Sequence, residues 1–240
     1  MDKIILITGA SSGIGEGIAR ALGAAGAKVL LGARRLKRIE AIAAEVRESG
    51  GTAEARALDV ADRGAVAAFA QAALDLWGRI DVLVNNAGVM PLSPLAAGKH
   101  DEWERTVDVN IKGVLWGIGA VLPVMERQGS GQIINIGSIG ARSVVPTAAV
   151  YCATKFAVRA ISDGLRQESS KIRVTCVNPG VVESDLASTI THEETKALMN
   201  DFRAIALQPA DIAHAVRHVI EAPDGVDTSE ITVRPTASPY

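Results

Sequence analysis

Short apolar runs of strand length alternate with helical patterns along the chain, and this alternation constrains the fold most. The runs are mostly continuous rather than alternately apolar and polar, as in strands covered on both faces. Between them apolar residues recur with the 3.6-residue period, as at Val66, Phe69 and Ala73. The pattern predicts an α/β, doubly wound fold of about seven parallel strands with helices on both faces, the strands lying near residues 4–8, 29–33, 53–58, 80–85, 133–137, 172–177 and 231–233.

The division of the chain into domains follows from its length and its lack of linkers. At 240 residues the chain can bury one large core, and no stretch rich in Pro, Gly or Ser divides it. We therefore expect a single domain over residues 1–240. The longest irregular stretch, residues 178–191, precedes two short helical patterns at 193–206 and 209–222. Long loops in compact domains often cover a binding site, so we expect a substrate lid at about 184–206.

Charge and cysteine content narrow the class of partner and the compartment. The formal net charge is −2 and there are two cysteines, which we expect to be free and buried. We therefore expect a cytoplasmic protein that binds no nucleic acid. The apolar stretch at the N-terminus is too short for a signal peptide, and we expect no membrane span. His214 and His218 lie one helical turn apart but lack a third ligand, so no metal site is predicted.

A glycine-rich turn joins the first predicted strand to the first predicted helix. Glycine there permits a tight turn and lets the backbone and the helix N-terminus approach a pyrophosphate. An ordinary strand-to-helix turn is the alternative, but three glycines within seven residues at this junction favour a dinucleotide cradle of the Rossmann type. The residues assigned to the cradle are Gly9, Ser11, Ser12, Gly13, Ile14 and Gly15.

The end of the second strand indicates which dinucleotide is bound. Folds that prefer NAD usually place an acid there to hold the ribose hydroxyls, whereas this chain has Arg34 and Arg35. A guanidinium suits the 2′-phosphate of NADP in a charge-assisted contact. The alternative is a solvated helix face or a basic patch for nucleic acid, which we accept for Lys37 and Arg38. The sequence predicts NADP(H) rather than NAD. Asp59 is assigned to the adenine amine, with a helix N-cap as its rival role.

Tyr151 and Lys155 lie four residues apart on a predicted helix, and Ser138 follows an apolar strand. The spacing places the phenol and the amine on one helix face. Hydride transfer to a carbonyl needs a proton donor at the oxygen. Bringing a phenol's pKa to neutrality takes roughly 4 kcal/mol, and an ammonium about 5 Å away supplies on the order of 3 kcal/mol. The charge of an oxidised nicotinamide supplies the rest. Ser138 either fixes the substrate oxygen or caps the next turn.

Together these motifs make the chain resemble the short-chain dehydrogenase/reductase family over nearly its whole length. Residues 8–15 match the motif TGxxxGxG, residues 85–88 match NNAG, and residues 179–180 match a Pro-Gly pair. The resemblance implies that Lys155 also binds the nicotinamide ribose and that Asn110 holds a water linked to Lys155. It gives the catalytic set Asn110, Ser138, Tyr151 and Lys155. With Arg34 and Arg35, the cofactor contacts assigned beyond the cradle are Asp59, Val60, Asn86, Ala87, Gly88, Tyr151, Lys155, Pro179, Gly180, Val182 and Ser184.

The resemblance also indicates a branch of the family, an oligomeric state and the lining of the substrate pocket. The last strand lacks a glycine-rich close and is similar to the branch with clavulanic acid dehydrogenase and serine 3-dehydrogenase-like enzymes. Members of the family are commonly tetramers or dimers, so we expect a homotetramer or homodimer. The segments expected to line the substrate pocket are mostly apolar: Val89, Met90, residues 139–146, Leu186, Met199 and Phe202. Arg142 would meet a substrate carboxylate only by turning inward.

The function expected from the sequence is an NADP(H)-dependent carbonyl reductase or alcohol dehydrogenase. Tyr151 would act as the acid and base on a small ketone, aldehyde or alcohol. Two alternatives remain open: an NAD-preferring alcohol or 3-hydroxy acid dehydrogenase, and a dinucleotide-binding sensor that keeps the fold without the chemistry.

Overall fold

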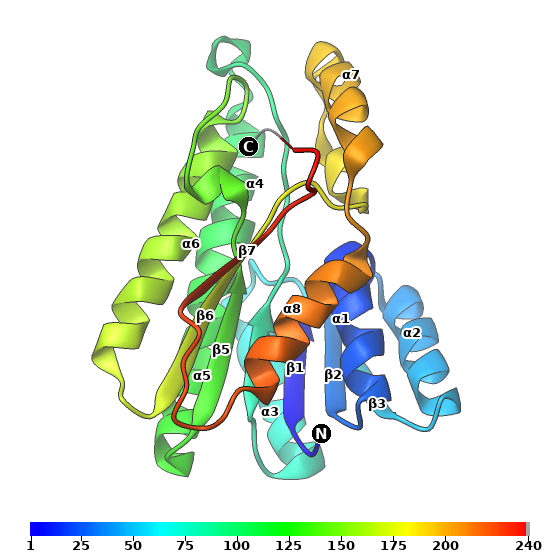
Figure 1. The fold of residues 1–240 in the computed structure, drawn as a ribbon, viewed down its shortest axis with the longest axis vertical. Helices are drawn as coiled ribbons and strands as arrows, with labels where there is room; N and C mark the ends of the chain where they lie inside the picture. The colour runs from blue at the N-terminus through cyan, green and yellow to red at the C-terminus, as the bar shows by residue number, and fades with distance from the viewer. Residues whose placement is uncertain (239–240) are drawn as a thin grey trace.

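A sheet of seven parallel strands runs through the centre of the protein (Figure 1). The structure is a computed structural model that describes residues 1–238, and for residues 200 and 201 it describes only the backbone. The strand order is β3-β2-β1-β4-β5-β6-β7. This arrangement confirms the predicted doubly wound α/β fold. The strands are β1 (Ile4–Thr8), β2 (Lys28–Ala33), β3 (Thr52–Ala57), β4 (Val82–Asn85), β5 (Gly131–Ile136), β6 (Ile172–Pro179) and β7 (Glu230–Val233).

Helices cover both faces of the sheet, which explains why the strands read as continuous apolar runs. One face is covered by α1 (Gly13–Ala24), α2 (Leu36–Glu48) and α8 (Pro209–Glu221), the other by α3 (Arg63–Trp77), α5 (Gly113–Gln128) and α6 (Ala149–Glu168). Each layer has its own apolar cluster. Ile18 of α1 and Val216 of α8 are buried in the first, and Phe69 of α3 and Val121 of α5 in the second. The predicted free cysteines, Cys152 and Cys176, are both buried.

Local signals set several helix boundaries. Asp62 caps α3 by accepting hydrogen bonds from the Gly64 and Ala65 amides at 2.7 and 3.1 Å. The same helix ends at Gly78, whose φ of 76° is the left-handed conformation that glycine adopts without a steric penalty. These boundaries direct the chain back to the amino edge of the sheet.

The loops that carry the predicted motifs all emerge at the carboxyl edge of the sheet. The crossover direction reverses between β1 and β4, so the segments that follow Thr8 and Asn85 diverge there and leave a crevice. The segments after β5 and β6 reach the same edge, because Ile136 pairs in register with Val177. Residues far apart in the sequence therefore face one cleft.

Above this edge the chain forms a series of short helices. They are η4 (Asp185–Thr189), α7 (Glu193–Phe202) and η5 (Arg203–Ile205), at the top of Figure 1. An isolated parallel bridge between Val182 and Leu207 fastens the base of this segment. The predicted irregular stretch after β6 thus contains one turn of 3₁₀ helix.

A continuous helical segment between the sheet and the surface passes through three elements: α4 (His100–Val107), the π-helical turn η2 (Asp108–Lys112) and α5. By length and composition alone this 29-residue segment could cross a membrane, with a mean hydropathy of 1.4 in its most apolar window, of which 39% is buried. The expectation that no run approaches a span is corrected for this segment. Buried core helices pass the same test, and Val114, Val121 and Met125 of α5 are buried in the second cluster.

Candidate active site

A cleft of about 520 Å³ lies along the carboxyl edge of the sheet. Its walls contain every residue predicted from the sequence to bind a cofactor or to act in catalysis, except Gly15 and Asn110. Gly15 packs beneath the turn, where a Cβ would come within 2.4 Å of the Gly9 carbonyl oxygen. The residues that line the cleft and were assigned neither to the cofactor nor to catalysis are Ala33, Leu58, Val89, Arg105, Val109, Ile136, Gly137, Asp185, Leu186, Ser188 and Thr189.

The glycine-rich turn is held against the end of β4 by side-chain hydrogen bonds. The Thr8 hydroxyl accepts from the Asn86 and Ala87 amides, each at 3.1 Å. The Asn86 side chain donates to the Thr8 and Gly9 carbonyls at 2.9 and 3.1 Å. Gly9 has φ of 67°, and a Cβ there would lie 2.7 Å from the Ala87 Cα, so a larger residue would not fit. The turn leads directly into the N-terminus of α1, which suits an anionic pyrophosphate.

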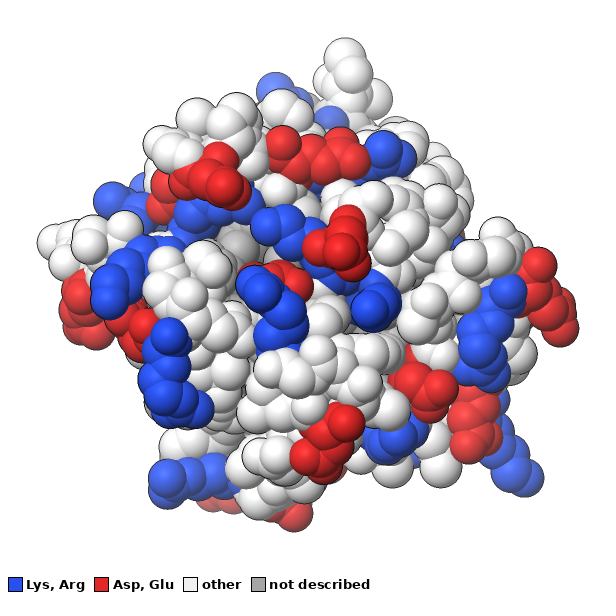
Figure 2. Space-filling model, turned by 90° about the horizontal axis from the view of Figure 1, so that it is seen from below, with Lys and Arg blue, Asp and Glu red and all other residues white. Residues whose placement is uncertain are grey.

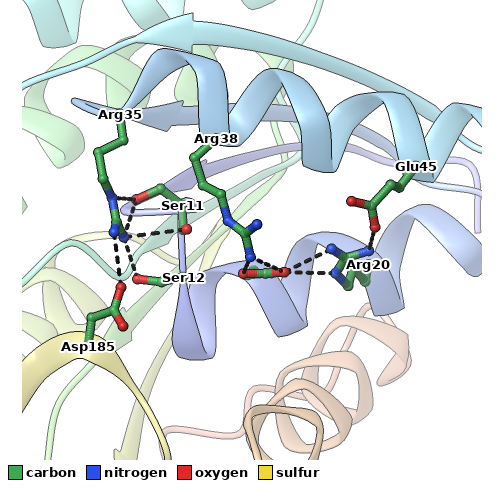
Figure 3. A network of polar contacts seen from close by, with 8 residues as sticks. Ser11, Ser12, Arg20, Arg35, Arg38, Glu45 and Asp185 are labelled. Atoms are coloured by element: carbon green, nitrogen blue, oxygen red, sulfur yellow. Dashed lines mark hydrogen bonds and ion pairs between the residues drawn. The ribbon is translucent and has the colours of Figure 1, made fainter.

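At the adenosine end of the cleft, Arg35 lies along the cradle (Figure 3). Its guanidinium donates to Ser11 Oγ at 3.0 and 3.1 Å and to Ser12 Oγ at 2.7 Å. Its third nitrogen pairs with Asp185 at 3.0 Å. The Ser12 hydroxyl also forms a hydrogen bond with the Asp185 carboxylate, whereas the Ser11 oxygen accepts from Arg35 and leaves its own proton available to a phosphate. Arg34, which also lines the cleft, is exposed and forms no ion pair with any residue that the structure describes.

Asp59 has partners other than those considered from the sequence. Its carboxylate accepts from the Ala61 amide at 3.0 Å and pairs with Arg105 at 3.2 Å. Burial opposes its ionisation, but the Ala61 hydrogen bond and the Arg105 charge outweigh burial and lower the pKa of Asp59. The helix cap is supplied by Asp62, so the rival N-cap role is wrong. Arg105 lies on α4, and no local pattern in the sequence signals its contact with Asp59.

Ser138 and Tyr151 meet at the deep end of the cleft. Ser138 caps η3 (Ile139–Ala141), since its Oγ accepts from the Gly140 amide at 3.0 Å. It also forms a side-chain hydrogen bond with Tyr151. The two roles weighed from the sequence are therefore compatible, because a hydroxyl accepts one hydrogen bond while it donates another.

Lys155 is buried beside the ring of Tyr151, as the spacing on α6 predicts. Its Nζ lies 5.7 Å from the ring centroid and donates to the Ile136 carbonyl at 2.8 Å. Burial raises the pKa of Tyr151 to about 12, against the hydrogen bond from Ser138, and burial lowers the pKa of Lys155 to about 8. Burial thus outweighs the lowering of the phenol's pKa that the sequence predicts from Lys155, because desolvation disfavours both charged forms.

Asn110 lies behind the cleft, in the π-helical turn η2. Its side chain is 1% exposed. It donates to the Val89 carbonyl at 2.9 Å and to Thr154 Oγ1 at 3.1 Å, and it accepts from the Val89 amide at 2.9 Å. Asn110 thereby fixes the backbone that follows the NNAG motif. π-helical turns often occur at functional sites.

Sequence reasoning missed a polar network behind Ser138. The Asn178 side chain is buried. Its Oδ1 accepts from the Ser138 amide at 3.2 Å and its Nδ2 donates to Glu230 at 2.6 Å. Glu230 also pairs with Arg142 at 2.9 Å, so Arg142 is directed to that acid. An asparagine directly before the Pro-Gly pair is the only signal that the sequence offers.

Comparisons with known proteins agree with this geometry. Residues 3–195 match the family described as short chain dehydrogenase. The chain belongs to that family. An uncharacterized oxidoreductase of Staphylococcus saprophyticus is 46% identical over 240 residues, which cover 98% of this chain and 97% of that protein.

Two solved structures of this family are similar over nearly their full lengths. A serine dehydrogenase complexed with NADP⁺ is 33% identical, with a TM-score of 0.91, and the match covers 99% of this chain and 96% of that one. An alcohol dehydrogenase of the archaeon Thermococcus sibiricus, complexed with 5-hydroxy-NADP, is 32% identical with a TM-score of 0.89, and the match covers 99% and 98%. Both ligands agree with the predicted cofactor, NADP(H).

Proposed function

We propose that this short-chain dehydrogenase is an NADP(H)-dependent oxidoreductase that interconverts a ketone or aldehyde with its alcohol. One observation carries the proposal: Ser138 and Tyr151 line both the cofactor cleft and a second cavity beside it. A substrate in the second cavity would place its oxygen between these hydroxyls and its carbon toward the cleft. Such placement brings the reacting groups together before reaction.

The residues of the cleft have separate roles in this proposal. Bound NADPH supplies the hydride that reduces the carbonyl carbon. Tyr151 donates its proton to the carbonyl oxygen as charge develops there, and in the reverse reaction it accepts the proton of the alcohol. Ser138 holds the same oxygen by a hydrogen bond. Lys155 holds the nicotinamide ribose, and its ammonium stabilises the phenolate that forms on proton transfer.

Replacing the phenol tests the mechanism. We expect Tyr151→Phe to lower kcat by a factor of about 10² to 10⁴ in NADPH oxidation with a panel of ketones and aldehydes, since general acid catalysis contributes that much. NADPH affinity and thermal stability should change little, because the substitution removes a single oxygen and keeps the aromatic ring. Asp163→Asn, at an exposed position of the same helix, is the matched control. Undiminished turnover in Tyr151→Phe would refute the mechanism.

The preference for NADP(H) is supported by the cationic end of the cleft. Arg34 has no ion-pair partner among the described residues, and Arg35 orients two serine hydroxyls. We expect the double variant Arg34→Ala, Arg35→Ala to lose NADPH affinity by at least tenfold while NADH affinity is unchanged. Comparable efficiency of the unaltered enzyme with NADH would instead favour the NAD-preferring alternative.

We further propose a cytoplasmic homotetramer or homodimer that binds neither nucleic acid nor membrane, with residues 184–206 as its substrate lid. Leu115 of α5 and Phe156 of α6 are 41% and 40% exposed, which suits helix packing between subunits. On the face seen in Figure 2, basic and acidic side chains are mixed rather than gathered by sign, which offers little to a polyanion. Light scattering would exclude the oligomer if the unaltered protein has the mass of a monomer and the Leu115→Glu variant has the same mass.

A further inference from the structure

The second cavity, which we call the substrate cavity, is largely apolar. It has a volume of about 460 Å³. One wall is formed by the loop after Ser138, with Val145, and the other by the proposed lid, with Leu186, Met199 and Phe202. Met199 packs against the small buried cluster that includes Leu92 and Ala187. The lid thus presents an apolar surface to whatever lies above Tyr151.

Charge is nearly absent from this cavity. Among the described residues that line it, Arg203 is the only charged one. Its guanidinium already donates to Glu183 at 2.5 Å and to the Ser184 carbonyl at 2.9 Å. Arg142, the other cation considered for a substrate carboxylate, is held by Glu230 instead. The cavity therefore offers an anionic group no unpaired cation, and a cationic group no carboxylate, among these residues.

From this environment we infer that the substrate is an uncharged carbonyl compound with a sizeable apolar body, and that hydroxy acids and amino acids are excluded. The inference rests on the proposed function and specifies its substrate class. An ionised carboxylate or ammonium in this cavity would lose its hydration without gaining a partner, a costly exchange. An apolar body would instead displace water from the walls at a gain in free energy. This separates the chain from a serine dehydrogenase, whose substrate carries both charges.

The reaction balances with the groups already named. The carbonyl carbon of the substrate accepts one hydride, with its electron pair, from NADPH, and the oxygen accepts one proton from Tyr151. The products are the neutral alcohol and NADP⁺. The phenolate regains its proton from water.

The first experiment compares matched substrates with the intact enzyme. We expect kcat/KM for a β-keto ester to exceed that for the corresponding β-keto acid at least a hundredfold. Along a series of 2-alkanones, kcat/KM should rise about fourfold for each added methylene until the cavity is filled. L-Serine with NADP⁺ should give no turnover. Turnover of the acid or of serine at rates comparable to the neutral compounds would overturn the inference.

A charge introduced on the lid tests whether this wall of the substrate cavity contacts the substrate. We expect Met199→Lys to lower kcat/KM for the ester and to raise it for the acid. The ratio of kcat/KM for the ester to that for the acid should fall at least tenfold. Leu76→Lys, at a 40% exposed position of α3, is the matched control and should leave the preference unchanged. If Met199→Lys changes kcat/KM by the same factor for the ester and the acid, this wall does not distinguish the two substrates and the proposed location is wrong.

Binding separates failure of this inference from failure of the proposed function. In the complex of Tyr151→Phe with NADP⁺, calorimetry should show the neutral alcohol binding at least tenfold more tightly than the hydroxy acid. If the hydroxy acid binds as tightly, the substrate class is wrong whether or not turnover occurs. If the neutral alcohol binds preferentially but neither class is turned over by the intact enzyme, the substrate cavity is correctly described and the proposed oxidoreductase activity is wrong.

Discussion

At the scale of single residues, Asn178 links Ser138 to a charged network at the sheet edge. Its amide accepts from the Ser138 backbone and donates to Glu230. The fit is close, since a Cβ on Gly137 would lie 2.3 Å from Asn178 Oδ1. Asn178 therefore acts as a positioning residue, because it fixes the backbone from which the Ser138 hydroxyl projects.

Replacing the Asn178 amide by a carboxylate tests this role. In Asn178→Asp the donor to Glu230 is lost and two acids face one another. We expect the free energy of unfolding to fall by about 1–3 kcal/mol, measured by urea denaturation at pH 7, with a lower kcat. Glu230→Gln restores a donor, so the double variant should recover most of the loss. Additive losses in the double variant would show that the two side chains do not interact.

The pKa of Tyr151 depends on burial, which the spacing of residues in the sequence does not reveal. The four-residue interval correctly predicts that Lys155 lies beside the ring, and Coulomb attraction alone would then lower the phenol's pKa. The structure adds burial, which raises that pKa to about 12. Burial depends on contacts from η3 and the lid, which no local pattern encodes.

At the scale of elements, η4 is fastened on both sides of the cofactor cleft. Asp185, its first residue, pairs with Arg35 beyond the end of β2. Thr189, its last residue, accepts from the Met90 amide at 3.0 Å on the opposite side. At the base, the Cβ of Ser184 lies where a side chain on Gly13 would be, 2.7 Å from that ideal position. The proposed lid thus begins in contact with the cradle and with Arg35, one of the groups that would meet a 2′-phosphate.

Removing the charge of Asp185 tests this connection. The carboxylate lies beside the proposed 2′-phosphate site and would repel that anion, although screening at this 60% exposed side chain keeps the effect small. We expect Asp185→Asn to lower the Kd of NADPH about three- to fivefold and to leave that of NADH unchanged, as measured by fluorescence titration. Asp75→Asn on α3 is the control. Weaker NADPH binding would mean that Asp185 supports Arg35 rather than competing with the phosphate.

The elements differ in how well the sequence predicts them. Strands and amphipathic helices follow from short-range periodicity, so β1 and α3 were predicted close to their bounds. The π-helical turn η2 was not predicted, because no periodic pattern in the sequence distinguishes it from the helices on either side. Its geometry suits the three hydrogen bonds of Asn110 with Val89 and Thr154, which are tertiary contacts. The 3₁₀ helix η4 likewise depends on tertiary contacts, with Arg35 and Met90, that no local pattern in the sequence indicates.

At the scale of the whole molecule, the order of the strands brings the functional residues to one edge. The cleft collects residues from the ends of β1, β2, β3, β4, β5 and β6 and from α6. The sequence predicts this convergence, because parallel strands share their carboxyl edge. It does not predict Arg105 or Asp185, which reach the cleft from α4 and η4 through the path of the chain. The prediction was therefore strongest where topology alone determines position.

Lys155 also gives the whole molecule a distinct pH dependence. Burial lowers its pKa from the ordinary 10.5 to about 8 in the fold. Between these values the unfolded chain binds a proton that the native state has released, so stability rises with pH. The slope approaches roughly 1.4 kcal/mol per pH unit. Cys176, whose pKa burial raises from 9.0 to about 11, opposes this trend above pH 9, because its thiol then ionises only in the unfolded chain, and the two contributions nearly cancel there.

We therefore expect the cofactor-free enzyme to gain about 1 kcal/mol of unfolding free energy from pH 8 to 9 through this residue. In Lys155→Met, which keeps an unbranched apolar side chain but has no titrating group, the gain should disappear. Urea denaturation of both proteins at four pH values across this window measures the difference in unfolding free energy. The protein concentration is kept fixed, because the stability of an oligomer depends on it. Parallel curves for the two proteins would show that Lys155 is not desolvated in the native state, and the ammonium would then be charged throughout the working range of the enzyme.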